Sequence, residues 1–411
     1  MRITIINNSD SRGGAAIASF RMLEALRSQG VDARMLVMHK GTRSQWVQQV
    51  EPAWRRKACF LAEHLDIFAH NGLSRAKLFQ ASTARWGMPL HSHPWVKHAD
   101  YVLLGWINQG MLSLSEIAKI KAPVAWVMHD MWCLTGACHH AGLCRKYEKM
   151  CDSCRLFRGS DESTDQPHDL SWSTWMRKQE LYSAKSILFI AVSHWLAGKC
   201  AESALLGKQR VEVVPNAFPV ADFIAKRNDD GANVKTIVMG AARLDDPIKG
   251  LDLAIDALNM LDERKVKARA VFFGDLKDPN ALDRLTLPYV HVGPLNMEQI
   301  KELYATSHVV LSSSHYETLP TTLIEGMAAG CVPVTFGQGG QADIVDHFTT
   351  GYIAQYPDAA DLARGLEWAL AGNVDTAALP EAMSQRFSAE AVAKRLLTIL
   401  NENNEQNTQQ Q

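Results

Sequence analysis

The sequence predicts an α/β fold made of two doubly wound domains, and two observations support this prediction. Short apolar runs of strand length alternate along the chain with segments that have the periodicity of an amphipathic helix. The chain has 411 residues, of which 47% are hydrophobic, and this length exceeds the size at which one hydrophobic core usually stops growing. We therefore expect two α/β units, each with a parallel sheet covered by helices on both faces.

The first unit is predicted to begin with a strand, a helix and a second strand. Residues 2–7 and 35–38 are apolar runs, and residues 15–29 between them have helical periodicity. The adjacent glycines Gly13 and Gly14 precede this helix and predict a tight turn at its N-terminus. Further buried strands are expected at residues 101–104, 124–128 and 187–192.

The second unit repeats the alternation after a polar connection at residues 225–234. We expect residues 1–217 to form the first domain, with a cysteine-rich insertion at 133–154, and residues 218–386 to form the second. The strands expected in the second domain are 236–239, 268–273, 290–292, 309–312 and 332–335, and the helices include 251–261 and 297–306.

The C-terminal region is predicted to consist of one helix and a tail. Residues 387–400 form an amphipathic pattern with Ser388 as a candidate N-cap, and we expect this helix to pack back toward the first domain. Residues 401–411 are almost all Asn, Gln and Glu, which cannot bury apolar area. The composition therefore predicts a disordered tail.

Composition and charge exclude several classes of function. The 43 Lys and Arg residues balance 44 Asp and Glu residues, so the overall charge of -1 favours neither nucleic acid nor an anionic membrane. No apolar run approaches the length that crosses a bilayer, and the first residues lack the basic and apolar regions of a signal peptide. We expect a cytoplasmic protein with at most peripheral contact with the inner membrane.

Charged side chains follow the predicted strands of the second unit, where ligands bind in open α/β sheets. Arg243 and Lys249 follow the strand at 236–239, and together they are suited to neutralise a pyrophosphate without a metal ion. Glu317 lies in a loop and Glu325 lies eight residues later in a helix. The helix N-terminus between them, at residues 320–322, offers backbone N–H groups and a positive dipole to a diphosphate.

Isolated glutamates more often solvate an exposed helix face than bind a ligand. Here the helix around Glu325 also contains the small residues Gly326, Ala328 and Ala329, which favour a buried helix. The carboxylates and the cations together therefore indicate a binding site for a nucleotide diphosphate.

This arrangement resembles the retaining GT-B glycosyltransferases of family 4, including bacterial exopolysaccharide and O-antigen enzymes of the colanic acid type. Arg243, Lys249 and Gly250 match one motif of that family, and Glu317 and Glu325 match its paired glutamates. The resemblance spans nearly the whole chain. It implies a GT-B fold with two Rossmann-like domains facing a cleft, and transfer of a sugar from a nucleotide-diphosphate donor to a saccharide acceptor with retention of configuration. It further implies a lipid-linked acceptor and a place in lipopolysaccharide or exopolysaccharide biosynthesis.

The resemblance also implies roles for individual residues. Glu325 would hold the donor ribose, Glu317 would contact the donor sugar as a catalytic residue, and the backbone from Leu319 to Thr321 would receive the diphosphate. Gly13 and Gly14 would lie near the donor phosphates. His129, which follows the strand at 124–128, would lie near C6 of the sugar, with no assignment as a base.

Four cysteines form a second candidate site, which has two interpretations. Cys138, Cys144, Cys151 and Cys154 are separated by five, six and two residues. Four thiolates can form a closed structural zinc site, but the spacing is looser than in paired zinc knuckles, and reduced thiols that merely pack are the alternative. No cofactor is expected for catalysis. The position of this insertion, shortly after His129, suggests that it influences acceptor choice.

The sequence is also compatible with two other functions, and one charged and aromatic segment has two interpretations. A nucleotide-sugar epimerase or hydrolase uses the same fold without an acceptor, and a zinc-containing sugar-nucleotide-binding protein needs no catalysis. The segment Trp54-Arg55-Arg56-Lys57, with Phe60, is either a membrane contact or a solvated helix face. The residues do not identify the donor base, the donor sugar or the acceptor.

Overall fold

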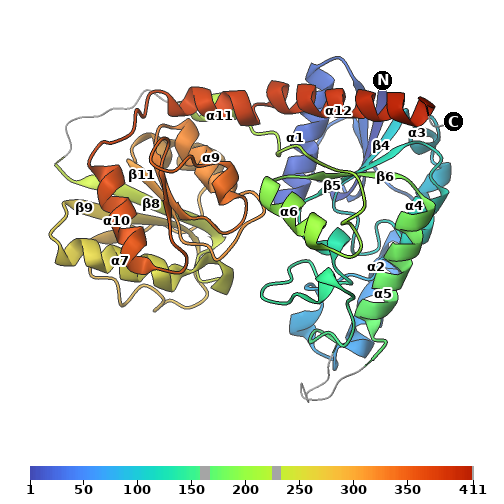
Figure 1. The fold of residues 1–411 in the computed structure, drawn as a ribbon, viewed down its shortest axis with the longest axis horizontal. Coiled ribbons are helices and arrows are strands. Elements are labelled where there is room, and N and C mark those ends of the chain that lie inside the picture. The colour runs from blue at the N-terminus through green and yellow to red at the C-terminus, as the bar shows by residue number, and fades with distance from the viewer. Residues whose placement is uncertain (158–166, 225–232, 410–411) are drawn as a thin grey trace. The chain divides into compact units, whose positions relative to one another are not determined.

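The computed structural model describes residues 1–157, 167–224 and 233–409. The chain divides into two compact units, which we call unit 1 (residues 1–217 and 392–411) and unit 2 (residues 218–391). Figure 1 shows the ribbon of both units. Most of the polar connection expected at residues 225–234 lies outside the described residues. Each unit is an α/β domain with one parallel sheet, as the alternating pattern predicts.

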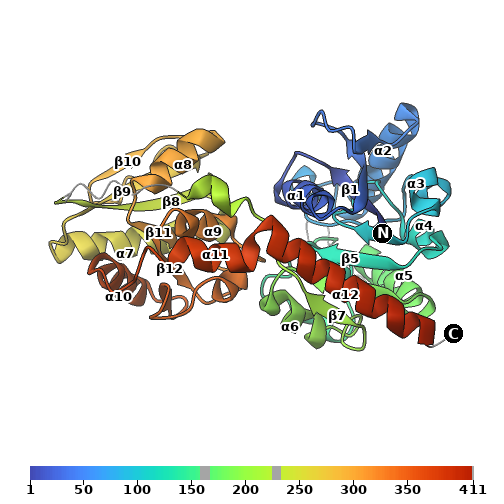
Figure 2. The ribbon, with the colours of Figure 1, turned by 90° about the horizontal axis from the view of Figure 1, so that it is seen from above.

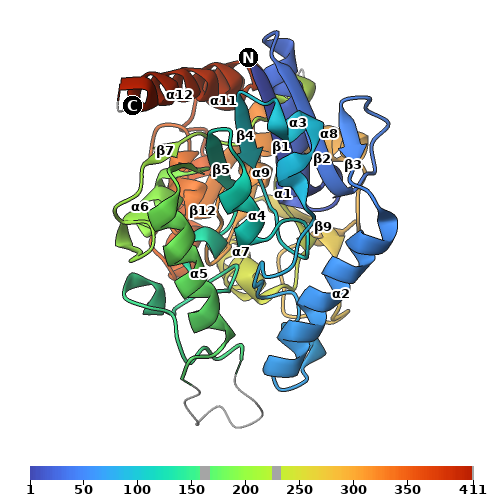
Figure 3. The ribbon, with the colours of Figure 1, turned by 90° about the vertical axis from the view of Figure 1, so that its right-hand side faces the viewer.

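The described part of unit 1 contains a seven-stranded sheet in the order β3-β2-β1-β4-β5-β6-β7, and every neighbouring pair is parallel. Figure 3 shows this order across the sheet, from β7 on the left to β3 on the right. The strand order reverses between β1 and β4, so the loops after these two strands flank the position where such sheets bind ligands. The strands are β1 (Arg2–Ser9), β2 (Asp32–His39), β3 (Val47–Gln49), β4 (Tyr101–Leu104), β5 (Val124–Met128), β6 (Ile187–Ala191) and β7 (Val211–Val213).

The helices of unit 1 pack on both sides of a sheet whose central strands are buried. All residues of β4 and β6 are buried, as expected for parallel strands that are covered on both faces. The helix after β1 contacts β1 and β2, and the helix after β6 contacts β6 and β7. The helices are α1 (Gly14–Ser28), α2 (Ala53–His70), α3 (Pro94–Lys97), α4 (Leu114–Lys119), α5 (Leu170–Ala184) and α6 (His194–Glu202).

The described part of unit 2 contains a six-stranded parallel sheet in the order β10-β9-β8-β11-β12-β13. Here the order reverses between β8 and β11, so the segments after these strands flank the predicted ligand position. The strands are β8 (Lys235–Arg243), β9 (Ala268–Asp275), β10 (Tyr289–His291), β11 (Val309–Ser312), β12 (Val332–Phe336) and β13 (Tyr352–Ala354). The helices are α7 (Leu251–Glu263), α8 (Met297–Ala305), α9 (Thr321–Ala328), α10 (Ala359–Leu370) and α11 (Leu379–Phe387).

The last helix, α12 (Ala389–Gln409), packs on unit 1 (Figure 2). Its N-terminus is capped by the hydroxyl of Ser388, which accepts a hydrogen bond from the Ala391 N–H at 3.3 Å. Tyr101 in β4 donates its hydroxyl to the Leu400 carbonyl at 3.0 Å and accepts from the Asn403 side chain at 2.9 Å. These contacts attach the C-terminal helix to the centre of the first sheet.

The prediction of a disordered tail at residues 401–411 is wrong for residues 401–409, which continue α12. A helix that is already packed extends easily, because each added residue gains a backbone hydrogen bond without a new nucleation step. The polar residues of the tail also find partners, since Arg210 in unit 1 donates to the Asn403 side chain at 3.2 Å. Residues 410 and 411 lie outside the described residues.

Candidate functional site

The loop after β8 in unit 2 is held against the end of β11. The side chain of Asp246 accepts from the Ile248 N–H at 3.3 Å and thereby shapes a short turn. Gly250 follows with a left-handed φ of 59°, and a Cβ atom there would lie 2.3 Å from the Ser313 carbonyl oxygen. Only glycine therefore fits this close approach. The close approach brings Lys249 next to the residues after β11. There the Ser313 hydroxyl donates a hydrogen bond to the Lys249 carbonyl at 2.9 Å.

This approach pairs two of the predicted site residues. Lys249 Nζ lies 2.5 Å from Glu317 Oε1, and Ser314 donates its hydroxyl to the same carboxylate oxygen at 3.1 Å. The side chains of Lys249 and Glu317 are 26% and 23% exposed, so both remain accessible to a ligand. The pair thus combines a cation with a fixed hydrogen-bond acceptor at the switch point of the second sheet.

Arg243, the other predicted cation, has different partners. Its Nη2 atom lies 2.8 Å from Asp246 Oδ2, and its Nε atom lies 3.6 Å from Asp245 Oδ1. The side chain is 32% exposed. Both predicted cations therefore carry carboxylate partners, and a bound diphosphate would share these cations with the carboxylates or displace them.

The N-terminus of α9 lies directly after Glu317 in the chain. Pro320 precedes the helix in an extended conformation, and no side chain caps the first turn, which begins at Thr321. Leu319 is buried beneath this segment. An N-terminus without a side-chain cap presents its first backbone N–H groups to an anion, which agrees with the diphosphate role predicted for residues 319–321.

Glu325 lies one turn into α9 and is 8% exposed. The hydroxyl of Tyr304 donates to Glu325 Oε2 at 3.4 Å. The helix packs tightly on β11, because a Cβ atom at Gly326 would lie 2.7 Å from Val310. The buried helix expected from its small residues is therefore confirmed, and it places Glu325 as a largely buried acceptor for hydroxyl or amide donors.

Sequence reasoning missed a third segment of this site, the loop after β12. A Cβ atom at Gly339, where φ is 94°, would lie 2.2 Å from the Glu317 carbonyl oxygen, and the Gly340 N–H donates to that oxygen at 2.7 Å. The Gln341 side chain is fully buried, and its Oε1 atom has no hydrogen-bond partner among the described residues. The adjacent glycines at the carboxyl end of a strand were the available signal.

In unit 1, Gly13 and Gly14 lie at the N-terminus of α1, as predicted. Gly13 has a φ of 90°, both glycines are exposed, and a Cβ atom at either would meet nothing within 4 Å. The preceding Asp10 fixes the loop by accepting from the Gly41 N–H at 2.7 Å and from the Thr42 hydroxyl at 2.6 Å. Burial opposes ionisation of Asp10, but these hydrogen bonds hold its pKa below the usual value. The glycine turn is therefore open on its outer side.

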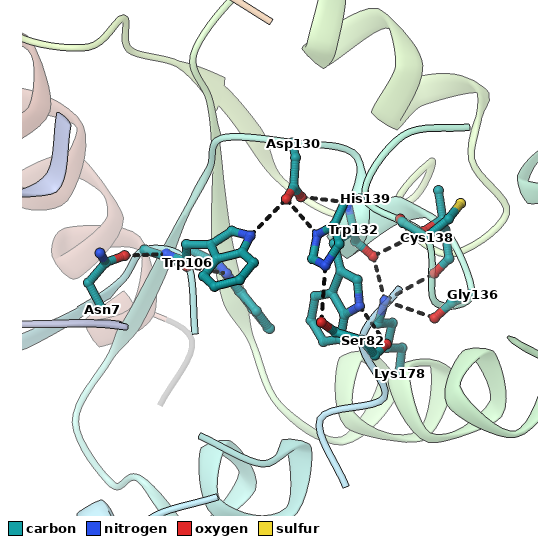
Figure 4. Close-up of polar contacts among 12 residues, drawn as sticks. Asn7, Ser82, Trp106, Asp130, Trp132, Gly136, Cys138, His139 and Lys178 are labelled. Carbon is teal, nitrogen blue, oxygen red and sulfur yellow. Dashed lines mark hydrogen bonds and ion pairs between the residues drawn. The ribbon is translucent and has the colours of Figure 1, made fainter. Parts of the chain in front are cut away.

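His129 directly follows β5, and the adjacent Asp130 is the centre of a polar network (Figure 4). Asp130 accepts from the indole N–H of Trp106 at 2.9 Å and from the Trp132 N–H at 2.8 Å, and it lies 2.7 Å from His139 Nδ1. Burial would raise the pKa of Asp130, but the neighbouring His139 holds it at about 2. The other ring nitrogen of His139 lies 3.0 Å from the Ser82 hydroxyl.

The Nε2 atom of His129 is buried, and this burial lowers the pKa of the imidazole to about 4, against the opposing effect of Asp130. The lowered pKa indicates that His129 is neutral at physiological pH and does not act as a cation. It belongs to unit 1, whereas Glu317 belongs to unit 2.

A buried lysine that the sequence did not signal holds the start of the cysteine-rich insertion. Lys178 in α5 donates to the carbonyl oxygens of Trp132, Thr135 and Gly136, the last two at 3.1 Å (Figure 4). Its Nζ atom also lies 3.4 Å from the centre of the Trp132 ring. Burial lowers the pKa of Lys178 to about 7. These contacts connect the network around Asp130 to the insertion.

The four candidate zinc ligands in the insertion are free thiols in this structure. Cys151 is buried and its sulfur accepts from the Gly136 N–H at 3.1 Å, whereas Cys144 is exposed. Burial, together with the nearby thiols of Cys154 and Cys151, raises the pKa of Cys138 to about 12. Across the described ranges, no group of three or more His, Cys, Asp or Glu side chains is arranged to hold a metal ion. The zinc site stays a prediction.

Comparison with solved structures shows which known folds this chain resembles. The fold is similar to that of HepE from Anabaena in complex with UDP-glucose, with a TM-score of 0.62 and 16% identity over 97% of this chain and 99% of that chain. It is also similar to the lipopolysaccharide outer core galactosyltransferase WaaB, with a TM-score of 0.61 and 12% identity over 98% of this chain and 100% of that chain. The chain therefore shares the GT-B fold, with two Rossmann-like domains, with these structures.

Sequence comparison finds similarity to glycosyltransferases, mainly in the second unit. Residues 222–391, which lie in unit 2, match the family model described as Glycosyl transferases group 1. The gpi3 subunit of phosphatidylinositol N-acetylglucosaminyltransferase from Schizosaccharomyces pombe is 25% identical over 229 residues, which cover 52% of this chain and 49% of that protein. A sulfoquinovosyl transferase from Arabidopsis thaliana is 26% identical over 140 residues, covering 33% of this chain and 26% of that protein. The chain thus spans about half the length of the first relative and about a quarter of the second.

No helix in the described part of the chain is long and apolar enough to cross a membrane.

Proposed function

We propose that this protein transfers a hexosyl group from a nucleotide-diphosphate donor to a saccharide acceptor. One observation carries the proposal: the Lys249–Glu317 pair and the uncapped N-terminus of α9 adjoin the switch point of the unit that matches the glycosyl transferase family. A cation, a carboxylate and free N–H donors at this position suit a sugar diphosphate better than an uncharged ligand.

The proposed donor site lies in unit 2. The first turn of α9 and the side chains of Lys249 and Arg243 bind the diphosphate, while Glu317 contacts the sugar. Glu325, a largely buried carboxylate, accepts hydrogen bonds from the ribose hydroxyls. The UDP-glucose complex of HepE supports a nucleotide sugar as the donor class, although the base and the sugar of this donor remain to be identified.

The proposed reaction retains the anomeric configuration. The bond between the anomeric carbon and the diphosphate oxygen breaks, and the acceptor hydroxyl forms its bond on the face that the diphosphate leaves. The hydroxyl proton passes to the departing phosphate oxygen. Lys249, Arg243 and the α9 dipole stabilise the negative charge that develops on that oxygen, and this stabilisation is the main contribution of unit 2 to the rate. No metal ion or cofactor enters these steps.

We assign acceptor binding to unit 1, where His129 and the glycine turn before α1 adjoin its switch point. In this proposal neutral His129 donates or accepts a hydrogen bond near C6 of the donor sugar, and Gly13 and Gly14 approach the donor phosphates. In this proposal the acceptor is a lipid-linked saccharide of bacterial lipopolysaccharide or exopolysaccharide synthesis, and the protein acts in the cytoplasm. The similarity in fold to WaaB, a lipopolysaccharide outer core galactosyltransferase, supports a place in polysaccharide synthesis.

The test is transfer by the purified protein. Wild-type protein and the variants Lys249→Ala and Glu325→Ala are incubated with a panel of nucleotide sugars and saccharide acceptors, and nucleoside diphosphate release and glycosylated product are both measured. The matched controls are Lys301→Ala and Glu298→Ala, which break an ion pair of 2.9 Å on the surface of α8. We expect turnover with one donor, a loss of at least about a hundredfold in both site variants, and little change in the controls.

Two outcomes contradict the proposal. Failure to bind any sugar nucleotide would remove the donor site. Nucleoside diphosphate release that needs no acceptor and yields no glycosylated product would instead indicate an epimerase or hydrolase.

A further inference from the structure

Helix α2 in unit 1 exposes an apolar face that the transferase proposal does not use. Trp54, Leu61 and Leu65 are 69%, 56% and 64% exposed. Their positions differ by seven and four residues, so at 3.6 residues per turn all three lie on one side of the helix. The opposite side, with Cys59 and Ile67, is buried in unit 1. Figure 3 shows α2 at the periphery of unit 1.

The segment after α2 extends this apolar face. Phe79 is 60% exposed, and its ring centre lies 5.0 Å from the ring of His64 on α2. His64 in turn packs on Phe60 at 4.0 Å. Leu73 at the end of the helix is 64% exposed. We call the surface formed by Trp54, Leu61, Leu65, Leu73 and Phe79 the α2 face.

The charges around the α2 face are mainly positive, although the whole chain is nearly neutral. Residues 51–86 contain six Lys and Arg residues against three Asp and Glu residues. The three acids are largely occupied or buried. Glu51 pairs with Arg56 at 3.1 Å, Asp66 pairs with Arg85 at 3.3 Å, and Glu63 is fully buried.

Two exposed cations, Arg55 and Lys57, flank the apolar residues on α2. At about 100° per residue they lie on either side of the row formed by Trp54, Leu61 and Leu65. An exposed apolar row with cations beside it is the pattern of a helix that lies in the surface of an anionic bilayer. A protein partner would need complementary acidic side chains, whereas a lipid surface needs only negative headgroups and an apolar interior.

We propose that the α2 face docks this protein on an anionic lipid bilayer, with Trp54, Leu61 and Leu65 inserted at the level of the headgroups and with Arg55 and Lys57 against lipid phosphates. The proposal rests on the exposed surface of unit 1 and not on the transferase activity. Membrane binding and sugar transfer are therefore measured separately, and either can fail without the other.

The experiment is co-sedimentation of the full chain with vesicles of phosphatidylcholine alone or of phosphatidylcholine mixed with phosphatidylglycerol. We expect binding to the mixed vesicles that weakens with salt, and little binding to phosphatidylcholine alone. The double variant Leu61→Ser, Leu65→Ser removes apolar contacts and should lower the partition coefficient by about tenfold or more. The double variant Arg55→Gln, Lys57→Gln should lower it by about fivefold for each charge on mixed vesicles only.

Matched controls come from unit 2. The double variant Val290→Ser, Val292→Ser removes two exposed apolar side chains, which are 51% and 42% exposed. The double variant Lys265→Gln, Lys267→Gln removes two exposed cations. Both controls should bind the mixed vesicles as the wild-type protein does.

Equal binding by the wild-type protein and the Leu61→Ser, Leu65→Ser variant would overturn the proposal, and so would absence of wild-type binding to mixed vesicles. A wild-type dimer in sedimentation equilibrium that this variant converts to a monomer would assign the face to self-association instead. If the serine variant fails to fold, the charge variant and the salt dependence still decide, because a docking role requires both effects.

Discussion

Glu317 and Lys249 show how a site depends on contacts between segments that are distant in sequence. The two residues are 68 positions apart, yet they form the central ion pair of the proposed donor site. A role for Lys249 was predicted from its place after a strand, and the role of Glu317 was implied by the family resemblance, but their contact was not predicted. It requires Gly250, which allows the loop after β8 to approach the end of β11. The ion pair of Arg243 with Asp246 is local, because these two residues are only three positions apart.

The lowered pKa of His129 predicts how stability changes with pH. The folded imidazole has a pKa of about 4, and the unfolded one has the ordinary value near 6.5. As the pH falls below about 6.5, the unfolded state takes up a proton that the folded state does not, so the free energy of unfolding decreases. The loss is complete near the folded pKa and amounts to at most about 3 kcal/mol.

The measurement is urea unfolding of the wild-type protein and of His129→Asn at about pH 7 and about pH 5. All other titrating groups are the same in both proteins and contribute equally to the loss of stability between the two pH values. We therefore expect the free energy of unfolding to decrease less in the variant, which lacks the His129 contribution. Equal losses would show that His129 is accessible to protons in the folded state.

At the scale of elements, the loop containing Gly250 is the part of the site most sensitive to backbone geometry. The variant Gly250→Ala places a Cβ atom 2.3 Å from the Ser313 carbonyl oxygen at a left-handed φ of 59°. We expect it to lower the unfolding free energy by more than about 2 kcal/mol and to weaken donor binding, because Lys249 moves away from Glu317.

Gly372 provides the control for this strain. It also has a positive φ, of 79°, but a Cβ atom there meets nothing within 4 Å. The variant Gly372→Ala should therefore cost only about 1 kcal/mol and leave donor affinity unchanged. Similar effects of both substitutions, measured by thermal unfolding and by donor titration, would argue against a positioning role for the Gly250 loop.

The cysteine-rich insertion is an element whose composition leaves two alternatives open. The zinc hypothesis predicts that purified protein contains about one zinc ion per chain, and that Cys151→Ala loses this ion and lowers the melting temperature. Packed thiols predict no metal in either protein and only a small change in stability from one buried sulfur.

Elemental analysis of the wild-type protein and of the variants Cys151→Ala and Cys200→Ala distinguishes the two. Cys200 is buried outside the insertion and serves as the control. If the zinc content and the acceptor preference are unchanged in Cys151→Ala, the insertion has neither the metal role nor the acceptor role suggested for it.

At the scale of the whole molecule, α12 returns the end of the chain to the first sheet. Val392, Leu396 and Leu400 are at most 1% exposed, and Tyr101 contacts the end of this apolar row. The variant Leu396→Ala should lower the stability of unit 1 by about 2–5 kcal/mol, because it leaves a cavity between α12 and the sheet.

Thr398→Ala, at an exposed position of the same helix, should change stability by less than about 1 kcal/mol. Hydrogen exchange of β4 and of the second sheet shows where the effect occurs. Equal deprotection of both sheets would contradict an attachment of α12 to unit 1 alone.

The sequence by itself determined the class of fold and most of its elements. The strands expected at 101–104 and 124–128 are observed as β4 and β5, and the helix expected at 251–261 extends only two residues further as α7. Such elements are predictable because the alternation of buried and exposed positions is local and repeats with the period of a strand or helix. The positions of Gly13 and Gly14 at the start of a helix and of Glu325 inside a helix were likewise predicted from local pattern.

Only the tertiary structure decided which of these elements meet. It brought Glu317 to Lys249, placed Gln341 beside them, buried Lys178 under the insertion and extended α12 through residues that have little apolar character of their own. These outcomes depend on strand order and on close approaches of the backbone between distant segments. Local sequence patterns do not encode such contacts, because their free energy arises only when both partners are already folded.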